Sequence, residues 1–241
     1  MLITTKGIVL KSIKYGETSL IVDIFTEQLG LRKYIVSGVR KKKSRIGAAL
    51  LQVMSQVEIV AYEREGKDLN RLKEIRSAFV YQNIPLNIHK GAVGLFMAEM
   101  AQKTLRETEA NQPLYDFLSK SFIHLDTHVG SIGNLPLCFL LELSAFLGFL
   151  PETDPDINEN YFDLENGVFT HVEPLHNNHL DVEHSQILAI LLNAHFEKCH
   201  ELKLNVQQRR FLLEKLLDYY RFHIENLPVI NSHLILKEIL G

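Results

Sequence analysis

A dense run of basic side chains lies between residues 32 and 45, and its residue types suggest binding chemistry. Seven Lys or Arg residues occur there with no Asp or Glu among them: Arg32, Lys33, Arg40, Lys41, Lys42, Lys43 and Arg45. Cations at this density repel one another unless a polyanion neutralises them, and the phosphates of a nucleic acid do so while releasing counterions. The run therefore predicts a nucleic-acid-binding site. A solvated charged loop and a targeting patch are the alternatives.

An aromatic residue adjoins the first two cations. Strand alternation over residues 31–37 would place Arg32 and Tyr34 on one face and Lys33 on the other. Exposed aromatic rings stack on bases while a basic groove follows the backbone, which gives binding that tolerates any base sequence. We therefore expect Arg32, Lys33 and Tyr34 to contribute to the same site as the loop.

The elements that would position these residues are short strands. Five segments are rich in Ile, Val, Phe and Tyr, and turn signals separate them: residues 7–13, 19–26, 31–37, 53–62 and 71–80. Residues 27–30 are expected to form a hairpin turn, with Gly30 at positive φ. Five short strands in about 80 residues favour a small closed barrel of the OB-fold type, because closure removes exposed sheet edges.

From residue 83 the pattern becomes helical. Apolar residues recur at helical spacing in six segments: residues 89–107, 113–126, 134–150, 184–199, 207–227 and, shorter, 230–240. The third is apolar on nearly every side and should lie at the centre of a bundle. Residues 151–183 form a long connection in which 161–169 reads as a small hairpin turning at Asn166-Gly167. The predicted class is α+β, with a five-stranded OB-fold barrel (1–82) followed by an all-α helical domain (83–241).

Charge divides in the same place. Residues 1–82 hold 15 Lys and Arg against 8 Asp and Glu, a net +7, and residues 83–241 hold 11 against 21, a net −10. The basic half suits a polyanion, and the acidic half suits protein partners. The N-terminus lacks the features of a secretory signal, no apolar run reaches the length of a membrane helix, and two cysteines are too few for a disulfide framework. We expect a cytoplasmic protein with no membrane association.

The N-terminal motifs resemble those of the bacterial RecO family of recombination mediators. The resemblance is carried by Gly7 and Val9 in the opening strand, Tyr15-Gly16-Glu17, residues 26–31 and the loop GVRKKKSRIGAALLQ at residues 38–52. It covers the first 82 residues closely, and the succession of helices covers the remainder more loosely.

The resemblance implies a role in the RecF pathway of recombinational DNA repair. RecO-like proteins bind single- and double-stranded DNA, anneal complementary strands, engage the single-stranded DNA-binding protein (SSB), and with RecR help to load the recombinase RecA. Under that reading the protein is not an enzyme and associates with the nucleoid. Arg209 and Arg210 are candidates for binding the acidic tail of SSB.

Several members of the family hold zinc with two CxxC pairs after the apolar central helix. Here residues 151–183 contain no cysteine, so a site of that composition is excluded and no cofactor is predicted. We expect apolar packing to replace the metal in the hairpin, by Tyr161, Phe162, Leu164 and Phe169. Two weaker metal sets remain open: oxygen ligands at EF-hand spacing in residues 154–165, and nitrogen and sulfur ligands from His176, His179, His184, His195 and Cys199.

Catalytic motifs are missing from the sequence. It has no GxxxxGK[ST] phosphate loop, no GxSxG elbow and no HExxH helix. Two alternatives to a recombination mediator follow from the residues alone. One is a general RNA- or single-strand-binding OB-fold protein, and the other is a metal-dependent nuclease using the acidic or His-rich groups of residues 154–184.

Overall fold

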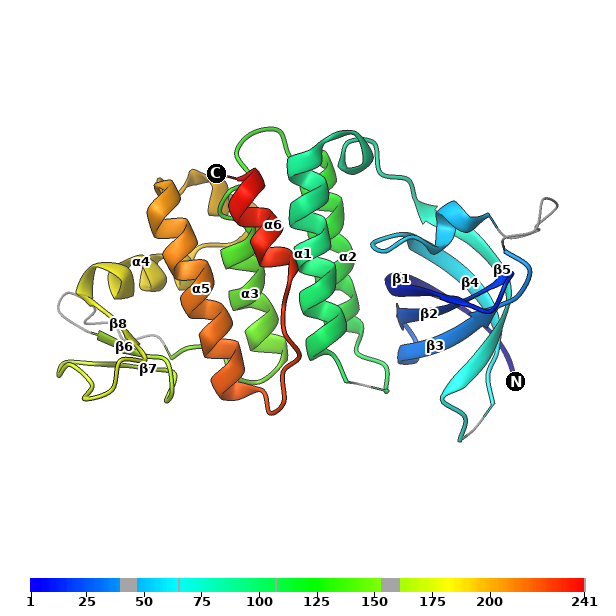
Figure 1. Cartoon of the computed structure of the whole chain (residues 1–241), viewed down its shortest axis with the longest axis horizontal. Coiled ribbons are helices and arrows are strands. Elements are labelled where there is room, and N and C mark those ends of the chain that lie inside the picture. The colour runs from blue at the N-terminus through cyan, green and yellow to red at the C-terminus, as the bar shows by residue number, and fades with distance from the viewer. Residues whose placement is uncertain (40–46, 65, 107, 153–160, 241) are drawn as a thin grey trace. The chain divides into compact units, whose positions relative to one another are not determined.

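The computed structural model describes residues 1–39, 47–64, 66–106, 108–152 and 161–240 (Figure 1). Five strands make up the first part of the chain: β1 (Leu2–Tyr15), β2 (Ser19–Thr26), β3 (Gly30–Val36), β4 (Gln56–Tyr62) and β5 (Leu69–Phe79). They form a closed barrel in the order β1-β2-β3-β5-β4. All neighbours are antiparallel except β3 and β5, which close the barrel in parallel. This confirms the predicted five-stranded OB-fold barrel and the turn with Gly30 at φ 66°.

Strand β1 is longer than the sequence pattern indicates because it pairs on both of its edges. Its first half pairs with β4 and its second half with β2, and Gly7 pairs with a residue of each. A Cβ at Gly7 would lie 2.4 Å from Cγ2 of Ile24. Only glycine permits this close approach at the bend between the two halves of the barrel. A bulge between Val9 and Lys11 then shifts the register of the second half.

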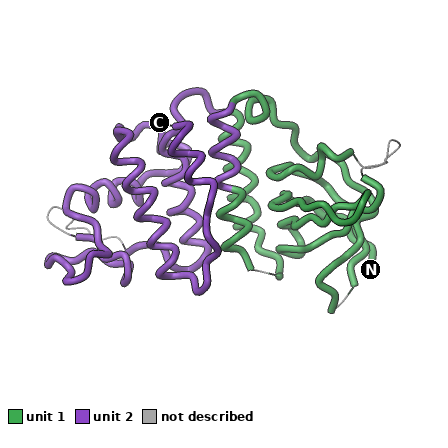
Figure 2. The backbone as a smooth tube through the Cα atoms, viewed as in Figure 1, with its two compact units in different colours: residues 1–87, 98–127 green, residues 88–97, 128–241 purple. Residues whose placement is uncertain are grey.

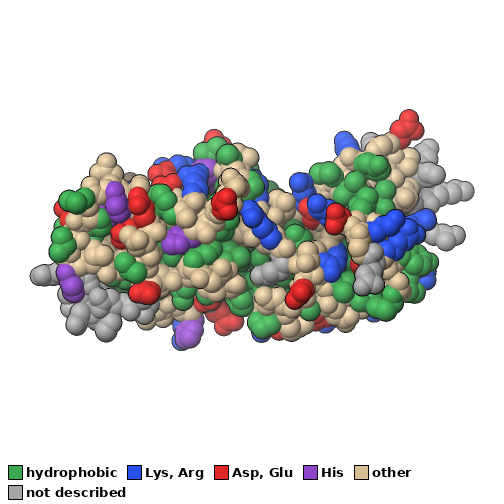
Figure 3. Space-filling model, turned by 90° about the horizontal axis from the view of Figure 1, so that it is seen from below, with side chains coloured by type: hydrophobic (Ala, Val, Ile, Leu, Met, Phe, Trp, Pro, Cys, Tyr) green, Lys and Arg blue, Asp and Glu red, His purple; other side chains and the backbone are tan. Residues whose placement is uncertain are grey.

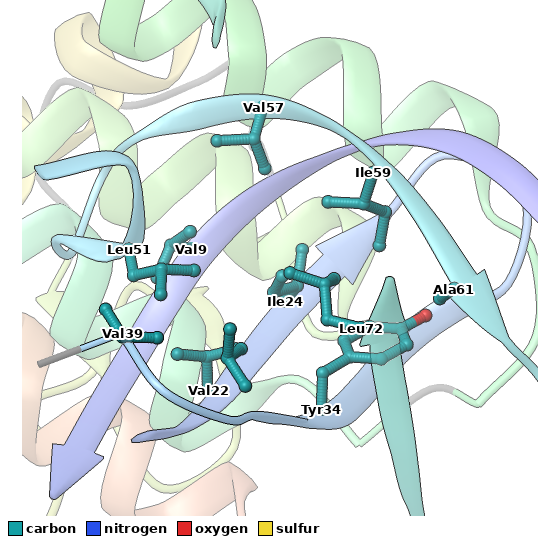
Figure 4. Close-up of a cluster of buried hydrophobic side chains, with 11 residues drawn as sticks. Val9, Val22, Ile24, Tyr34, Val39, Leu51, Val57, Ile59, Ala61 and Leu72 are labelled. Carbon is teal, nitrogen blue, oxygen red and sulfur yellow. The ribbon is translucent and has the colours of Figure 1, made fainter. Parts of the chain in front are cut away.

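The barrel interior is filled by aliphatic side chains from every strand, together with one tyrosine (Figure 4). Val39 and Leu51, which precede and follow the basic loop, join this core with exposed fractions of 4% and 1%. Leu51 belongs to the 3-10 helix η1 (Ala48–Leu51), which precedes the fourth strand, and β4 begins at Gln56, three residues later than expected. The connection from β3 to β4 is therefore anchored in the core at both ends.

In the described part of the chain, six α-helices follow the barrel and match the six helical segments of the sequence. They are α1 (Ile88–Thr104), α2 (Gln112–Thr127), α3 (Leu135–Phe146), α4 (Val182–Asn193), α5 (Val206–His223) and α6 (Ser232–Ile239). Nine of the twelve residues of α3 are buried, as its uniform apolarity predicts. Helix α4 ends earlier than expected because Ala194 is extended, and a 3-10 helix, η4 (Phe196–Glu201), continues the chain.

A small sheet lies between α3 and α4 in the sequence. Its strands β6 (Tyr161–Asp163) and β7 (Val168–Thr170) form the predicted hairpin, with Gly167 at φ 73°. A third strand, β8 (His179–Leu180), pairs with β6 and was not apparent from the sequence, because two residues carry no alternation pattern. Phe162 and Leu164 are buried as expected, and the ring of Phe162 lies 4.9 Å from that of Phe169.

The chain divides into two compact units (Figure 2). The first contains residues 1–87 and 98–127, and the second contains residues 88–97 and 128–241, so the division passes through α1. In the first unit α2 is bound to the barrel: the Gln56 side-chain amide donates to the carbonyl of Ser119 at 3.0 Å and accepts from its hydroxyl at 2.8 Å. No helix among the described residues is long and apolar enough to span a bilayer.

Candidate nucleic-acid interface

The side chains of the three predicted site residues on β3 lie on opposite faces of the strand. Lys33 lies on the outside of the barrel and is exposed, with Asp23 of β2 and Leu69 of β5 as its cross-strand neighbours. Arg32 and Tyr34 share the opposite face, as the alternation predicts, and that face is the inner one. Of the three, Lys33 is the residue best placed to meet a phosphate from solvent.

Tyr34 is a core residue. Its exposed fraction is zero, and Figure 4 shows its ring among Leu72 and other aliphatic side chains of the barrel interior. Its hydroxyl donates to Oε1 of Glu63 at 2.7 Å. Burial, together with this carboxylate, raises the pKa of Tyr34 far above its usual value. The expectation that Tyr34 stacks on bases is therefore wrong, because no face of the ring is accessible.

Arg32 lies near the same carboxylate. Its Nε is 4.0 Å from Oε2 of Glu63, and its side chain keeps 24% exposure. Asn70 donates to the same Oε2 at 2.7 Å, so Glu63 joins residues of β3 and β5. The carboxylate offsets part of the Arg32 charge, which leaves this cation less available to an external phosphate than Lys33.

The remaining five predicted cations, Arg40, Lys41, Lys42, Lys43 and Arg45, lie outside the described residues. The nearest core residues on either side, Val39 and Leu51, are buried in the barrel. The basic segment is thus part of the connection from β3 to β4.

Two further cations on the barrel exterior were missed by sequence reasoning. Lys11 of β1 pairs with Asp23, which pairs in turn with Lys33, so Lys11 and Lys33 lie on the same outer face. Arg71 of β5 pairs with Ile35, two residues beyond Lys33, and is also exposed. Figure 3 shows Lys and Arg side chains beside hydrophobic ones on one face of the barrel. Finding this group requires the strand register, which the sequence alone does not supply.

In the second unit, Arg209 and Arg210 border a small cavity between α5 and α6. Arg209 donates to the carbonyl of Leu204 at 2.6 Å, and Arg210 donates to that of Lys237 at 2.7 Å. The apolar part of the cavity wall comes from α3, α5, α6 and the C-cap of α6: Pro136, Leu137, Val206, Leu213, Leu236 and Leu240. Its volume of 30 Å³ has room for water but is small beside an ordinary ligand pocket of about 300 to 1,000 Å³. A peptide side chain would fit only if α6 moved.

The histidine and acidic candidates do not converge on a metal site in the described residues. His176 lies 3.3 Å from Asp163, His179 lies 3.4 Å from Glu173, and His184 lies 2.8 Å from Asp181. Each imidazole thus has its own carboxylate partner. Cys199 is buried in η4, and His195 precedes that helix as its N-cap. Within the part of the chain that the structure describes, no group of three or more His, Cys, Asp or Glu side chains could hold a metal ion. Residues 154–160 of the EF-hand-like set lie outside that part.

The zinc site found in several members of the family that the sequence resembles does not fit the residues of this chain. Residues 151–183 lack cysteine, and Cys138 and Cys199 are buried in α3 and η4. In the small sheet, Asp163 accepts hydrogen bonds from the backbone N–H of Glu165 at 2.8 Å and from the Asn166 side chain at 2.7 Å. Burial raises the pKa of Asp163, but hydrogen bonds from Asn166 and Glu165, with the charge of His176, outweigh it and lower the pKa overall. Hydrogen bonds and aromatic packing thus hold this sheet.

Comparison with known proteins assigns both parts of the chain. The family model described as Recombination protein O N terminal matches residues 1–81, and Recombination protein O C terminal matches residues 85–232. The chain belongs to the RecO family. Proteins named DNA repair protein RecO are 35% identical over the full length of both chains in Phocaeicola vulgatus, and 36% identical over 99% of both in Bacteroides fragilis. The relative in Christiangramia forsetii is 37% identical over the full length of both chains.

The interval between the two RecO family regions coincides with a tight local structure. Residues 82–84 separate the matched ranges, and the backbone N–H groups of Gln82, Asn83 and Ile84 all donate to the Asp126 carboxylate at 2.8–2.9 Å. Asp126 is 1% exposed and ends α2 together with Thr127. The start of the helical region is therefore fixed to the helix that packs on the barrel.

Proposed function

We propose that this protein is a non-enzymatic recombination mediator of DNA repair. It binds single- and double-stranded DNA, anneals complementary strands, and acts with SSB and RecR to load RecA, in the cytoplasm at the nucleoid. The observation that supports this most is that three cations, Lys11, Lys33 and Arg71, lie on the exterior of a closed OB-fold barrel. The chain that carries this barrel belongs to the RecO family. The relatives' names, DNA repair protein RecO, agree with it.

Phosphate neutralisation accounts for both binding and annealing. The outer cations lie on strands of the barrel, and five more cations follow β3 in the sequence, from Arg40 to Arg45. Lys and Arg side chains that replace condensed counterions bind the backbone of any sequence. When two complementary strands are neutralised together, their mutual repulsion falls, and base pairing follows without any chemical step.

The helical unit is the proposed partner-binding part. Its net negative charge opposes DNA, yet Arg209, Arg210 and Lys237 surround an apolar cavity. A chain end that combines carboxylates with an apolar side chain, such as the acidic tail of SSB, would pair its charges with these cations while its apolar group displaced α6. Arg210 is the exposed member of the pair, and Arg209 packs against Gly133.

Strand annealing on bare and on SSB-coated DNA tests the proposal. The Lys41→Ala, Lys42→Ala, Lys43→Ala triple variant should slow annealing on both substrates, because it removes phosphate contacts. Arg210→Ala should slow annealing only on the coated substrate. The matched control replaces three exposed lysines outside the barrel, Lys120, Lys198 and Lys203, by Ala and should change neither rate.

The proposal fails if wild-type protein anneals neither substrate, or if it binds RNA in preference to DNA through contacts to the 2′-hydroxyl. If Arg210→Ala slowed annealing equally on both substrates, the cavity between α5 and α6 would not be the site that binds the SSB tail. The proposed DNA-binding role would be unaffected.

A further inference from the structure

The two cysteines of the sequence lie in the interior of the second compact unit. Cys138 belongs to α3 and is 2% exposed, and Cys199 belongs to η4 and is 0% exposed. The small sheet and α4 separate them in the sequence. Two thiols from distant segments can be joined by a covalent bond only if the fold holds their backbones close together. The contacts between α3 and η4 therefore decide what this pair can do.

Asn134 holds η4 against the start of α3. Its side-chain amide donates to the carbonyls of Cys199 at 2.8 Å and of Leu202 at 2.9 Å. Its own carbonyl accepts a hydrogen bond from the backbone N–H of Cys138 at 3.2 Å. A residue and the one four positions later lie on the same face of a helix. The face of α3 that carries Asn134 and Cys138 is therefore the face that meets η4 at Cys199.

The thiols of Cys138 and Cys199 are hydrogen-bonded to each other. This bond, together with burial, raises the pKa of Cys138 far above its usual value. A disulfide bond is about 2.05 Å long, so the sulfur atoms must approach further, but they are already in contact. Because a thiol with a raised pKa is a weak nucleophile toward outside reagents, Cys138 is not the first of the pair to react.

A groove between α4 and η4 brings solvent close to Cys199. Its volume is 670 Å³, and its wall includes Lys198, Glu201 and Leu202 from the segment around Cys199. Helix η4 therefore has α3 on one side and the groove on the other. A 3-10 helix has poorer hydrogen-bond geometry than an α-helix, so η4 is among the first elements of this unit to open locally. A small oxidant reaches Cys199 when this short element opens, whereas Cys138 lies in a helix that is buried along most of its length.

We propose that Cys138 and Cys199 are a modification site, at which hydrogen peroxide forms an intramolecular disulfide. Cys199 attacks one oxygen atom of the peroxide, the O–O bond breaks, and a sulfenic acid and one water are formed. The thiol of Cys138 then attacks the oxidised sulfur, the S–O bond breaks, and the leaving oxygen takes up the Cys138 proton and departs as a second water. Two thiols and one peroxide thus give one disulfide and two waters. The thiols lose the electron pair that the peroxide gains.

The disulfide changes the second unit in two ways. It closes the long loop that contains the small sheet and α4, which restricts the unfolded chain and stabilises the folded state. It also fixes η4, which forms one wall of the groove, against α3. The oxidised protein should therefore unfold at a higher temperature than the reduced protein, and dithiothreitol should abolish the difference.

Peptide mapping of the full-length protein tests the inference. Native protein is treated with hydrogen peroxide, catalase stops the reaction, and the chain is then unfolded in excess iodoacetamide. We expect both cysteines to escape alkylation together, in a monomer that is lighter by two hydrogen atoms. A digest without reductant should yield one linked pair of peptides, and dithiothreitol should restore two alkylated cysteines.

Two single variants separate the steps of the reaction. In Cys138→Ala the oxidised Cys199 has no second thiol to react with, and dimedone should trap it as a sulfenic acid. In Cys199→Ala the remaining thiol should resist peroxide while the protein is folded, because Cys138 is buried in α3. Circular dichroism shows whether each variant is folded. The mapping of wild-type protein requires neither variant.

The inference is overturned if both thiols of the folded wild-type protein stay open to alkylation under peroxide that links them in the unfolded chain. It is also overturned if each thiol is oxidised separately to a sulfinic acid, or if the link joins two copies of the chain. The proposed DNA-binding function does not depend on these results, since neither cysteine belongs to the barrel.

Discussion

The hydroxyl of Tyr34 donates a hydrogen bond to the carboxylate of Glu63 at 2.7 Å, at one end of the barrel core. Asn70 donates to the other oxygen of the same carboxylate, and the Glu63 backbone exchanges hydrogen bonds with Met1. One acidic residue thereby ties β3, β5 and the start of the chain together. Tyr34 contributes to these hydrogen bonds and to core packing. This structural role explains why a tyrosine stands next to Arg32 and Lys33 in the sequence, and no stacking on bases is needed.

Replacing Tyr34 should therefore change stability and leave DNA affinity unaltered. Tyr34→Phe removes a hydrogen bond to a charged acceptor and should cost about 1 to 3 kcal/mol of the free energy of unfolding. Tyr34→Ala also leaves a cavity and should cost about 3 to 5 kcal/mol. Urea denaturation measures both values. A loss of single-strand affinity in a folded Tyr34→Phe variant would contradict the assignment of Tyr34 to the core.

Gly7→Ala should destabilise the barrel by overpacking. The added methyl group would lie 2.4 Å from Cγ2 of Ile24, so β1 or β2 must shift, at a cost of about 1 to 3 kcal/mol. Gly47→Ala is the control, because Gly47 has φ −69° and a Cβ there meets no described atom within 4 Å. Thermal unfolding of both variants checks the prediction, and equal midpoints would show that β1 accommodates the methyl group.

The triple replacement of Lys41, Lys42 and Lys43 by Ala should flatten the salt dependence of binding. If each lysine meets one phosphate, the slope of log K against log salt should fall in magnitude by about 2.7 for duplex and about 2 for single strands. The loss of affinity should be similar for all base sequences. Titrations at several salt concentrations measure the slope. An unchanged slope would assign the phosphate contacts to the strands and exclude the loop.

Asp163 should make the small sheet sensitive to acid. A carboxyl whose pKa is lowered by folding stabilises the native state above its ordinary value of 3.8, and this stability is lost as the pH falls through the lowered pKa. Asp163→Asn should therefore be less stable than wild type near neutral pH, with a difference that shrinks below pH 3.8. Urea denaturation across this range tests it. A constant difference would show that the Asp163 charge is not what stabilises the sheet.

Periodicity and turn chemistry predicted most of the fold, because they act locally. Five strands, six helices and the Asn166-Gly167 hairpin followed from alternation, helical spacing and glycine positions. Features that depend on distant partners could not be read in this way. The double pairing of β1 around Gly7 and the strand β8 appear only when the sheets are assembled.

The candidate site was predicted in part for the same reason. Alternation correctly separated Lys33 from Arg32 and Tyr34. It did not say which face was interior, and that choice decides whether Tyr34 meets solvent or the core. Lys11 and Arg71 escaped notice because they lie near Lys33 only through the register of β1, β2, β3 and β5.

The hydrogen bonds from the backbone of residues 82–84 to Asp126 limit where the chain can be cut into fragments. A fragment that ends where the first family region ends, at residue 81, lacks α2, and Gln56 then loses its partners on Ser119. Asp126 would be missing as well, so the backbone amides of residues 82–84 in any slightly longer fragment would lose their acceptor. A fragment that extends to the end of α2, at residue 127, keeps all of these hydrogen bonds. The boundary between the two family regions in the sequence therefore lies within a hydrogen-bonded part of the first compact unit, and it is not a point at which the protein can be cut.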